Sequence, residues 1–216
     1  TYLVVRPITR FNPAAEDHAY SDFDHVVYMG HRGTGVGKRF DLHQEFIENT
    51  IAAFNYACSK GGDAIELDVQ LSKDEVPIIY HDFFAKVFLH DRLNAHHNVS
   101  FHVPIKDIPF RDFKRISTNF MPHVRADIET EDNQSFETLE NVLKKVKPGC
   151  GINVEIKYPQ LKLNHLSEGA TGAELNDYTD RILEVLYRDA GSRPIVITTF
   201  HADLAVMVQL KQNRFR

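Results

Sequence analysis

The stretch Ala64-Ile65-Glu66-Leu67-Asp68-Val69-Gln70-Leu71 decides the fold class of this 216-residue chain. Apolar and polar residues alternate strictly along it, as they do along a β-strand. Glu66 and Asp68 stand two residues apart, so both carboxylates point to the same face of that strand. The stretch therefore predicts a strand that presents two acidic side chains on one side.

Strand-like runs recur on both sides of this stretch and alternate with helical patterns. Further strands are expected at residues 26–29, 76–80, 151–157 and 194–200, with an additional strand-like run at 2–5. Helices are expected at residues 48–58, 136–146, 178–187 and 203–210. This alternation is typical of an α/β fold with a parallel sheet. The stretch from 83 to 133 is expected to be an insertion with little regular structure.

The composition is that of an ordinary globular protein, with 43% hydrophobic and 25% charged residues. A net charge of −5 argues against a general binder of nucleic acid or anionic membranes. No apolar run approaches the roughly 18 residues of a membrane span. Cys58 and Cys150 lie far apart without metal-type spacing, so we expect free thiols in a reducing, cytoplasmic compartment.

Polar and ionisable residues recur at or near the carboxyl ends of the five expected strands. In chain order these residues are His31 and Arg32, Glu66 and Asp68, His81, Glu155 and Lys157, and Thr199. A parallel barrel builds its active site at that end of its strands, from the strand tips and the loops that follow them. The recurrence therefore predicts one site to which all five strands contribute.

Three carboxylates, of Glu66, Asp68 and Glu155, would converge if their common face is the interior of a barrel. Like charges held close together are costly unless a cation neutralises them. Carboxylate oxygens select a hard divalent cation, and both magnesium and calcium fit this ligand set. The alternative for Glu66 and Asp68 is a pair of solvent-facing charges on a half-exposed strand.

The other candidate residues suit acid–base chemistry on a phosphoryl group. His31 and His81 would supply the general acid and the general base, because imidazole titrates near neutral pH. Arg32 and Lys157 are cations that can bind phosphate oxygens. Glu48 precedes an expected helix, where it either interacts with the positive helix end or helps to position the site.

Two other features are discounted. The run Gly33–Lys38 looks like a phosphate-binding loop, but Arg32 and Arg39 stand where the Walker pattern requires Gly and Ser or Thr. We interpret it as a flexible loop after a strand. The remaining histidines of the insertion are expected in a solvated loop: His90, His96, His97 and His102.

Taken together, these motifs resemble those of the glycerophosphodiester phosphodiesterase family. The matching pieces are His31-Arg32-Gly33, Glu48-Asn49-Thr50, residues 62–69, the Lys73-Asp74 turn, residues 76–82 and Val154-Glu155-Ile156-Lys157. They follow the family's order from about residue 26 to residue 201. Residues 40–46 and the lead-in at 2–4 look like the eukaryotic glycerophosphocholine-cleaving branch.

The resemblance implies a TIM barrel that hydrolyses a glycerophosphodiester to glycerol 3-phosphate and an alcohol such as choline. By the same resemblance, Glu66, Asp68 and Glu155 would bind the metal, His31 and His81 would be the acid–base pair, and Arg32 and Lys157 would contact phosphate. A glycerol hydroxyl would attack phosphorus first, and water would then open the cyclic phosphate. The small-molecule diester is the expected partner, together with a further domain on the N-terminal side.

The count of strands departs from a whole barrel, which has eight. We therefore expect residues 1–25 to be a lead-in or linker, and residues 26–216 to form a domain that stops after about its fifth strand. A non-catalytic or truncated barrel that acts as a binding or regulatory module is the alternative. A lysophospholipid or glycerophosphoinositol is the alternative substrate.

Overall fold

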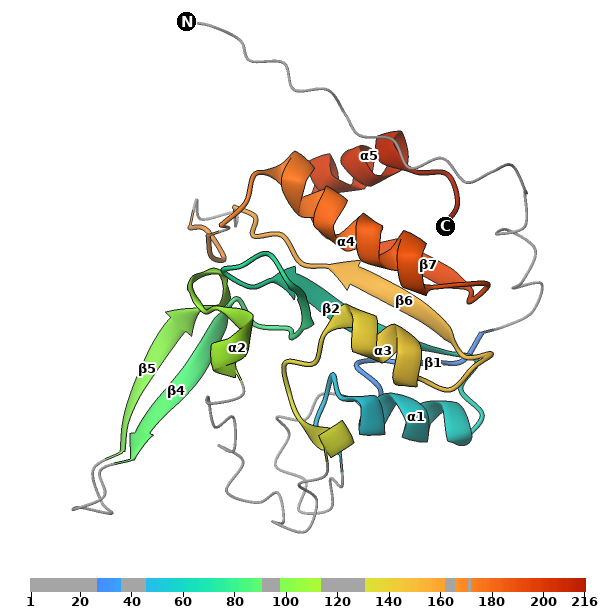
Figure 1. The fold of residues 1–216 in the computed structure, drawn as a ribbon, viewed down its shortest axis with the longest axis horizontal. Helices are drawn as coiled ribbons and strands as arrows, with labels where there is room; N and C mark the ends of the chain where they lie inside the picture. The colour runs from blue at the N-terminus through green and yellow to red at the C-terminus, as the bar shows by residue number, and fades with distance from the viewer. Residues whose placement is uncertain (1–26, 36–45, 91–97, 114–130, 162–165, 171) are drawn as a thin grey trace, which may run out of the picture.

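The computed structural model describes residues 27–35, 46–90, 98–113, 131–161, 166–170 and 172–216. Its central sheet contains four parallel strands in the order β1 (Met29–Gly30), β2 (Ala64–Leu71), β6 (Gly151–Ile156) and β7 (Ile195–Thr198). The main helices are α1 (Ile51–Ser59), α3 (Leu139–Lys145), α4 (Leu175–Asp189) and α5 (Ala202–Lys211), which lie along this sheet (Figure 1). The expected α/β fold with a parallel sheet is confirmed.

Side chains along β2 and β6 alternate in direction, which gives the sheet two faces of different character. Ile65, Leu67 and Val69 of β2 belong to the main hydrophobic core, together with apolar residues of β6 and of α1, α3, α4 and α5. The side chains between them in the sequence project to the opposite face, because successive residues of a strand alternate in direction. All eight residues of β2 are buried, so the solvent-facing alternative for its two carboxylates is wrong.

Strand β3 (Pro77–Ile79) differs from the expectation of a third parallel strand. It pairs antiparallel with β2, with Leu71 opposite Pro77 and Val69 opposite Ile79. The reason is the short turn at residues 72–76, where Glu75 has a positive φ of 60°. A connection this short can join antiparallel strands only, since a parallel partner needs a crossover of about a dozen residues. The chain therefore returns toward Asp68 after the turn.

The expectation of little regular structure between residues 83 and 133 is wrong for its first part. Strands β4 (Phe84–His90) and β5 (Asn98–Pro104) form an antiparallel hairpin that projects from the body of the molecule (Figure 1). The short helices η1 (Ile105–Asp107) and α2 (Phe110–Phe113) follow it, and η3 (Glu131–Asn133) precedes α3. Ala85 and Ile105 pack with Ile78 and Phe136 in a second, smaller core.

Threonine side chains fix where two of the helices begin. The Thr50 hydroxyl accepts a hydrogen bond from the Ala53 N–H at the start of α1. The Thr138 hydroxyl accepts one from the Asn141 N–H at the start of α3. Such caps satisfy N–H groups that have no partner inside the helix. The Glu48-Asn49-Thr50 motif thus ends on the cap of α1, and Glu48 and Asn49 remain outside the helix.

The expectation of two free thiols is wrong, because Cys58 and Cys150 form a disulfide. Cys58 lies in α1, near its last residue, and Cys150 directly precedes β6. The parallel pairing of β2 with β6 brings these segments together although 92 residues separate the cysteines. Sequence spacing does not reveal such a meeting, and the cytoplasmic location, which rested on free thiols, stays a prediction.

The parallel strands that the structure describes form an open sheet with β1 and β7 at its two ends. Arg216 lies beside the outer edge of β7, where its N–H donates to the Ile195 carbonyl and its carbonyl accepts from the Ile197 N–H. Among the described helices, none is long and apolar enough to cross a membrane. The lead-in strand at 2–5, residues 36–38 of the glycine-rich loop, His96 and His97 lie outside the described residues.

Candidate active site

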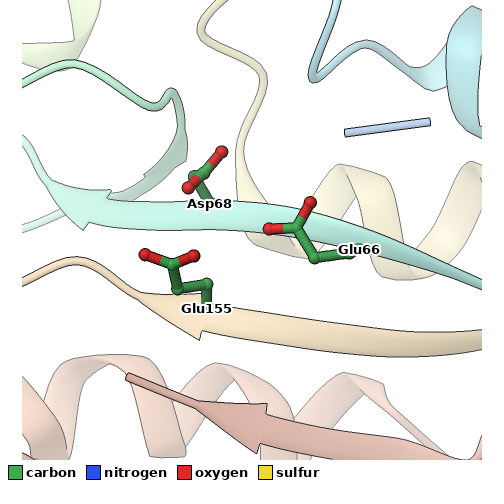
Figure 2. Close-up of side chains that lie close together, drawn as sticks. All are labelled: Glu66, Asp68 and Glu155. Atoms are coloured by element: carbon green, nitrogen blue, oxygen red, sulfur yellow. The ribbon is translucent and has the colours of Figure 1, made fainter. Parts of the chain in front are cut away.

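Three carboxylates meet on the face of the sheet that points away from the helices (Figure 2). Asp68 of β2 lies directly opposite Glu155 of β6 in the parallel register, and Glu66 stands two residues earlier on β2. One carboxylate oxygen of each residue lies within 4.8 Å of the other two. The convergence expected from the sequence is therefore present, and it results from the pairing of two neighbouring strands.

Burial makes this cluster electrostatically strained. Glu66 is 7% exposed and Asp68 is fully buried. Burial, together with the charges of Asp68 and Glu155, raises the pKa of Glu66 from its ordinary value of 4.5 to about 7, against a hydrogen bond from the Arg32 N–H and the Arg32 charge. A carboxylate that holds its proton up to neutral pH lacks sufficient positive charge around it.

The same residues fit a hard divalent cation. Among the residues that the structure describes, Glu66 Oε1 and Asp68 Oδ1 are buried without a hydrogen-bond partner. Buried oxygens of this kind are costly unless a donor or a cation satisfies them. An all-oxygen ligand set suits magnesium or calcium and not zinc. Glu66, Asp68 and Glu155 are thus the residues that would hold the ion.

Two cations border the cluster. Lys157 Nζ lies 3.1 Å from Glu155 Oε1 and 3.8 Å from Asp68 Oδ1. Arg32 Nε lies 3.3 Å from Asp68 Oδ2. Both side chains are 12% exposed, so each cation keeps one side toward the carboxylates and little contact with solvent.

Glu48 contacts the site through Arg32. Its Oε1 accepts a hydrogen bond of 3.3 Å from Arg32 Nη1, while the Arg32 N–H donates to Glu66 Oε2 over 2.8 Å. Arg32 itself has a positive φ of 50°. The next residue, Gly33, packs so closely on α1 that a Cβ atom there would lie 2.7 Å from the Ala53 Cβ. Glu48 therefore fixes the guanidinium, and Gly33 permits the turn that carries it.

The two histidines reach the cluster from different elements. His31 follows β1, and its Nε2 lies 3.8 Å from Glu66 Oε2 with the side chain 56% exposed. His81 follows β3, and its Nδ1 lies 2.8 Å from Asp82 Oδ1. With the proton on Nδ1, such a ring keeps Nε2 free to accept another proton. The antiparallel return of β3 brings His81 to the site without a place in the parallel sheet.

A cavity of about 570 Å³ opens beside the cluster. His81, Glu155 and Lys157 are among the residues that line it. Its volume falls in the range of small-molecule sites, which is about 300–1,000 Å³. Thr199 does not line this cavity; its hydroxyl donates to the Ile156 carbonyl and joins the end of β7 to β6.

Sequence reasoning missed Asn49. Its Nδ2 donates to Asp68 Oδ2 over 2.9 Å, and its Oδ1 accepts from the Asp68 N–H at 3.3 Å. Asn49 is 2% exposed and has a positive φ of 59°, a conformation that Asn tolerates better than most residues. Its place in the Glu48-Asn49-Thr50 motif is the signal that could have identified it.

Two further residues were missed or misjudged. Asp82 is the hydrogen-bond partner of His81, and its position next to that histidine could have indicated this role. His102 was expected in a solvated loop, but it lies on β5 and lines the cavity. No sequence pattern indicated that β5 would border the cavity, because the hairpin is not part of the alternating strands and helices of the parallel sheet.

Comparison with known proteins shows the family of the chain. Residues 31–216 match the sequence model of the glycerophosphoryl diester phosphodiesterase family. The glycerophosphocholine phosphodiesterase GPCPD1 of Homo sapiens is 30% identical over 87% of the chain, which spans only 30% of that relative. Glycerophosphodiester phosphodiesterase GDPD3 of Arabidopsis thaliana is 31% identical over 88% of the chain, which spans 52% of that protein.

Solved structures give the same fold. A glycerophosphodiester phosphodiesterase from Thermotoga maritima matches 83% of the chain with a TM-score of 0.51 and 26% identity, and the chain covers 56% of it. An Oleispira antarctica phosphodiesterase in complex with the product sn-glycerol-3-phosphate matches 86% of the chain with a TM-score of 0.58 and 20% identity, and the chain covers 62% of it. The expected TIM-barrel fold and the glycerophosphocholine branch are confirmed. The chain belongs to the glycerophosphoryl diester phosphodiesterase family.

Proposed function

We propose that this chain carries the catalytic residues of an enzyme that hydrolyses glycerophosphodiesters, with glycerophosphocholine as the substrate and a divalent cation as cofactor. The observation that carries the proposal is the cluster of Glu66, Asp68 and Glu155, which borders, through Glu155, a cavity that His81 and Lys157 also line. The relatives that bear the name glycerophosphocholine phosphodiesterase support this choice of substrate. The alternative of a binding module has no observation in its favour.

Each side chain has a role in this proposal. Glu66, Asp68 and Glu155 would hold the cation, which would supply positive charge to polarise phosphoryl oxygens. Lys157 and Arg32 bind the phosphate oxygens and neutralise their charge. Glu48 and Asn49 act as positioning residues, since they hold Arg32 and Asp68.

The two histidines move the protons. One imidazole takes the proton from the glycerol hydroxyl as that oxygen attacks phosphorus, and the other protonates the oxygen of the departing alcohol. A cyclic phosphate and the free alcohol result. Water then opens the ring with the same groups in reversed roles, and the product is glycerol 3-phosphate.

Release of glycerol 3-phosphate from glycerophosphocholine tests the proposal. We expect activity with added magnesium or calcium, loss of activity with EDTA, and recovery when the cation is restored. His31→Ala and His81→Ala should each lower kcat by about 100- to 10,000-fold, the usual range for general acid–base groups. Activity that persists in EDTA, or that survives both substitutions, would refute the mechanism. Lysophosphatidylcholine and glycerophosphoinositol, assayed in parallel, test the other substrates.

The organisation of the chain is part of the same proposal. Residues 26–216 would form the phosphodiesterase domain, and residues 1–25 would link it to a further domain on the N-terminal side in the cytoplasm. Limited proteolysis of the chain, followed by mass spectrometry, would test this division. Cleavage confined to residues 1–25 is expected, whereas a first cut within 46–90 would contradict it.

A further inference from the structure

Aromatic rings line part of the cavity. Phe83 and Phe84 come from the start of the hairpin, Tyr158 follows β6, and Phe200 follows β7. Phe84 is 37% exposed and Phe200 is 76% exposed. Exposed apolar side chains that gather around a cavity, unlike those scattered singly over a surface, mark a place where a ligand can bind. This part of the cavity therefore offers ring surface to a bound molecule.

The register of the hairpin explains why Phe84 reaches the cavity. Lys86 of β4 lies directly opposite His102 of β5, and Phe84 lies two residues before Lys86. Phe84 and His102 thus share one face of the hairpin, and both line the cavity. Ala85 and Val103 alternate with them and pack in the smaller core on the other face.

An acidic side chain accompanies the rings. Glu168 lines the cavity, and its N–H donates to the Gln160 carbonyl over 3.0 Å. No hydrogen bond or ion pair involves its carboxylate among the described residues. Lys157, which also lines the cavity, is already 3.1 Å from Glu155 and lies 5.6 Å from the centre of the Phe83 ring.

The cavity therefore carries groups of both signs. Lys157 offers positive charge next to Glu155 of the carboxylate cluster, where a phosphate would bind. Glu168 and the exposed rings of Phe84 and Phe200 line the same cavity. Aromatic faces together with a carboxylate attract organic cations, and quaternary ammonium groups are bound in this way. A ligand that carries phosphate at one end and a cation at the other matches this arrangement.

We infer that Phe84, Phe200 and Glu168 form a subsite for the quaternary ammonium head group of the substrate. The inference rests on the proposed function and adds the residues that select the alcohol. Phe84 and Phe200 supply ring faces, and Glu168 supplies the counter-charge. Phe83 is a poorer candidate because its ring already faces Lys157.

Binding of choline tests this subsite without any need for catalysis. Choline and its uncharged isostere 3,3-dimethylbutan-1-ol would be titrated into the chain and followed by NMR. We expect choline to bind about ten-fold more tightly than the isostere, in line with a desolvated cation–π contact. Glu168→Gln should remove most of that preference and leave the affinity for the isostere unchanged. Phe200→Leu and Phe84→Leu should each weaken choline binding several-fold.

A matched control is Phe101→Leu, since Phe101 is exposed on β5 but does not line the cavity. It should change neither affinity. Equal affinities for choline and the isostere, or choline binding that Glu168→Gln and Phe200→Leu leave intact, would overturn the inference. Selective choline binding without hydrolysis of glycerophosphocholine would refute the proposed function alone. Hydrolysis without choline selectivity would refute the subsite alone.

Discussion

The site has two parts that are built in different ways: an inner end, made of the Glu66, Asp68 and Glu155 carboxylates, and an outer end, the cavity lining supplied by the β4–β5 hairpin, Glu168 and Phe200. The three carboxylates of the inner end come from β2 and β6, two neighbouring strands in a continuous hydrogen-bonded ladder. The outer end comes from three separate segments: the β4–β5 hairpin, residues 166–170 and the segment that follows β7. A hydrogen-bonded ladder of strands holds its side chains in precise positions, whereas connecting segments tolerate changes of sequence and conformation.

Exposure follows the same division. Asp68 is fully buried and is held by Asn49, Arg32 and Lys157. Phe200 at the outer end is 76% exposed. A substitution at the inner end must therefore disturb several charged partners, whereas a substitution at the outer end removes a contact to the ligand. We expect the chemistry to reside in the ladder and the choice of alcohol to reside in the outer segments.

The largest effect is expected from Asp68→Asn, which keeps the shape and removes one charge from the centre of the cluster. Loss of one cation ligand should lower kcat/KM for glycerophosphocholine by about 1,000-fold, since a bound cation contributes several kcal/mol to transition-state stabilisation. Calorimetric titration with calcium should show a parallel loss of affinity.

Asp203→Asn is the matched control for that substitution. Asp203 is exposed in the first turn of α5, so its replacement should leave both measurements unchanged. If Asp68→Asn kept wild-type affinity for the cation, the inner end would not be the metal site, and the difference between the two ends would lose its chemical basis.

The disulfide should have the next largest effect, on stability. It closes a loop of 92 residues between α1 and the segment before β6. Cys150→Ser removes the constraint on the unfolded chain and should lower the free energy of unfolding by about 4 kcal/mol. Urea denaturation of the oxidised protein, the reduced protein and the variant measures this. Identical midpoints for oxidised and reduced protein would show that the bond does not form in solution.

A smaller effect is expected from Asn49→Gly. Glycine keeps the left-handed backbone at φ 59° but removes both hydrogen bonds to Asp68. Residues behind a metal ligand typically account for about 10- to 100-fold in metal affinity or activity. Cation affinity and kcat should both fall within that range. Glu75→Gly, at a similar positive φ in the turn before β3, is the control and should leave both values unchanged.

Much of the inner end could be predicted from the sequence because it depends on strand periodicity. Strict alternation along β2 placed Glu66 and Asp68 on one face, and the motif around Glu155 placed the third carboxylate on a second strand. Local rules of this kind need no knowledge of long-range contacts. The antiparallel pairing of β3 was missed because its apolar run fits either direction, and only the short turn before it decides.

The outer end could not be predicted in this way. His102 reaches the cavity because β4 and β5 pair with each other and pack on a small core that no sequence pattern identified. The Cys58–Cys150 bond likewise depends on the register between β2 and β6. The disulfide joins residues 92 positions apart, and local sequence patterns carry no signal for such contacts.

The pH dependence of cation binding provides the smallest and most specific test of the inner end. Burial and the nearby Asp68 charge raise the pKa of Glu66 from 4.5 to about 7. In the cation-free protein, the stability contributed by this proton is fully present below about pH 4.5 and is lost as the pH rises through 7. Cation binding requires the ionised carboxylate, so it shows the opposite dependence. Calcium affinity should rise about ten-fold per pH unit below 7 and level off above it.

Glu66→Gln removes the titrating group and should flatten the part of this slope that Glu66 contributes. An unchanged slope in that variant would assign the proton to another group and leave Glu66 ionised throughout.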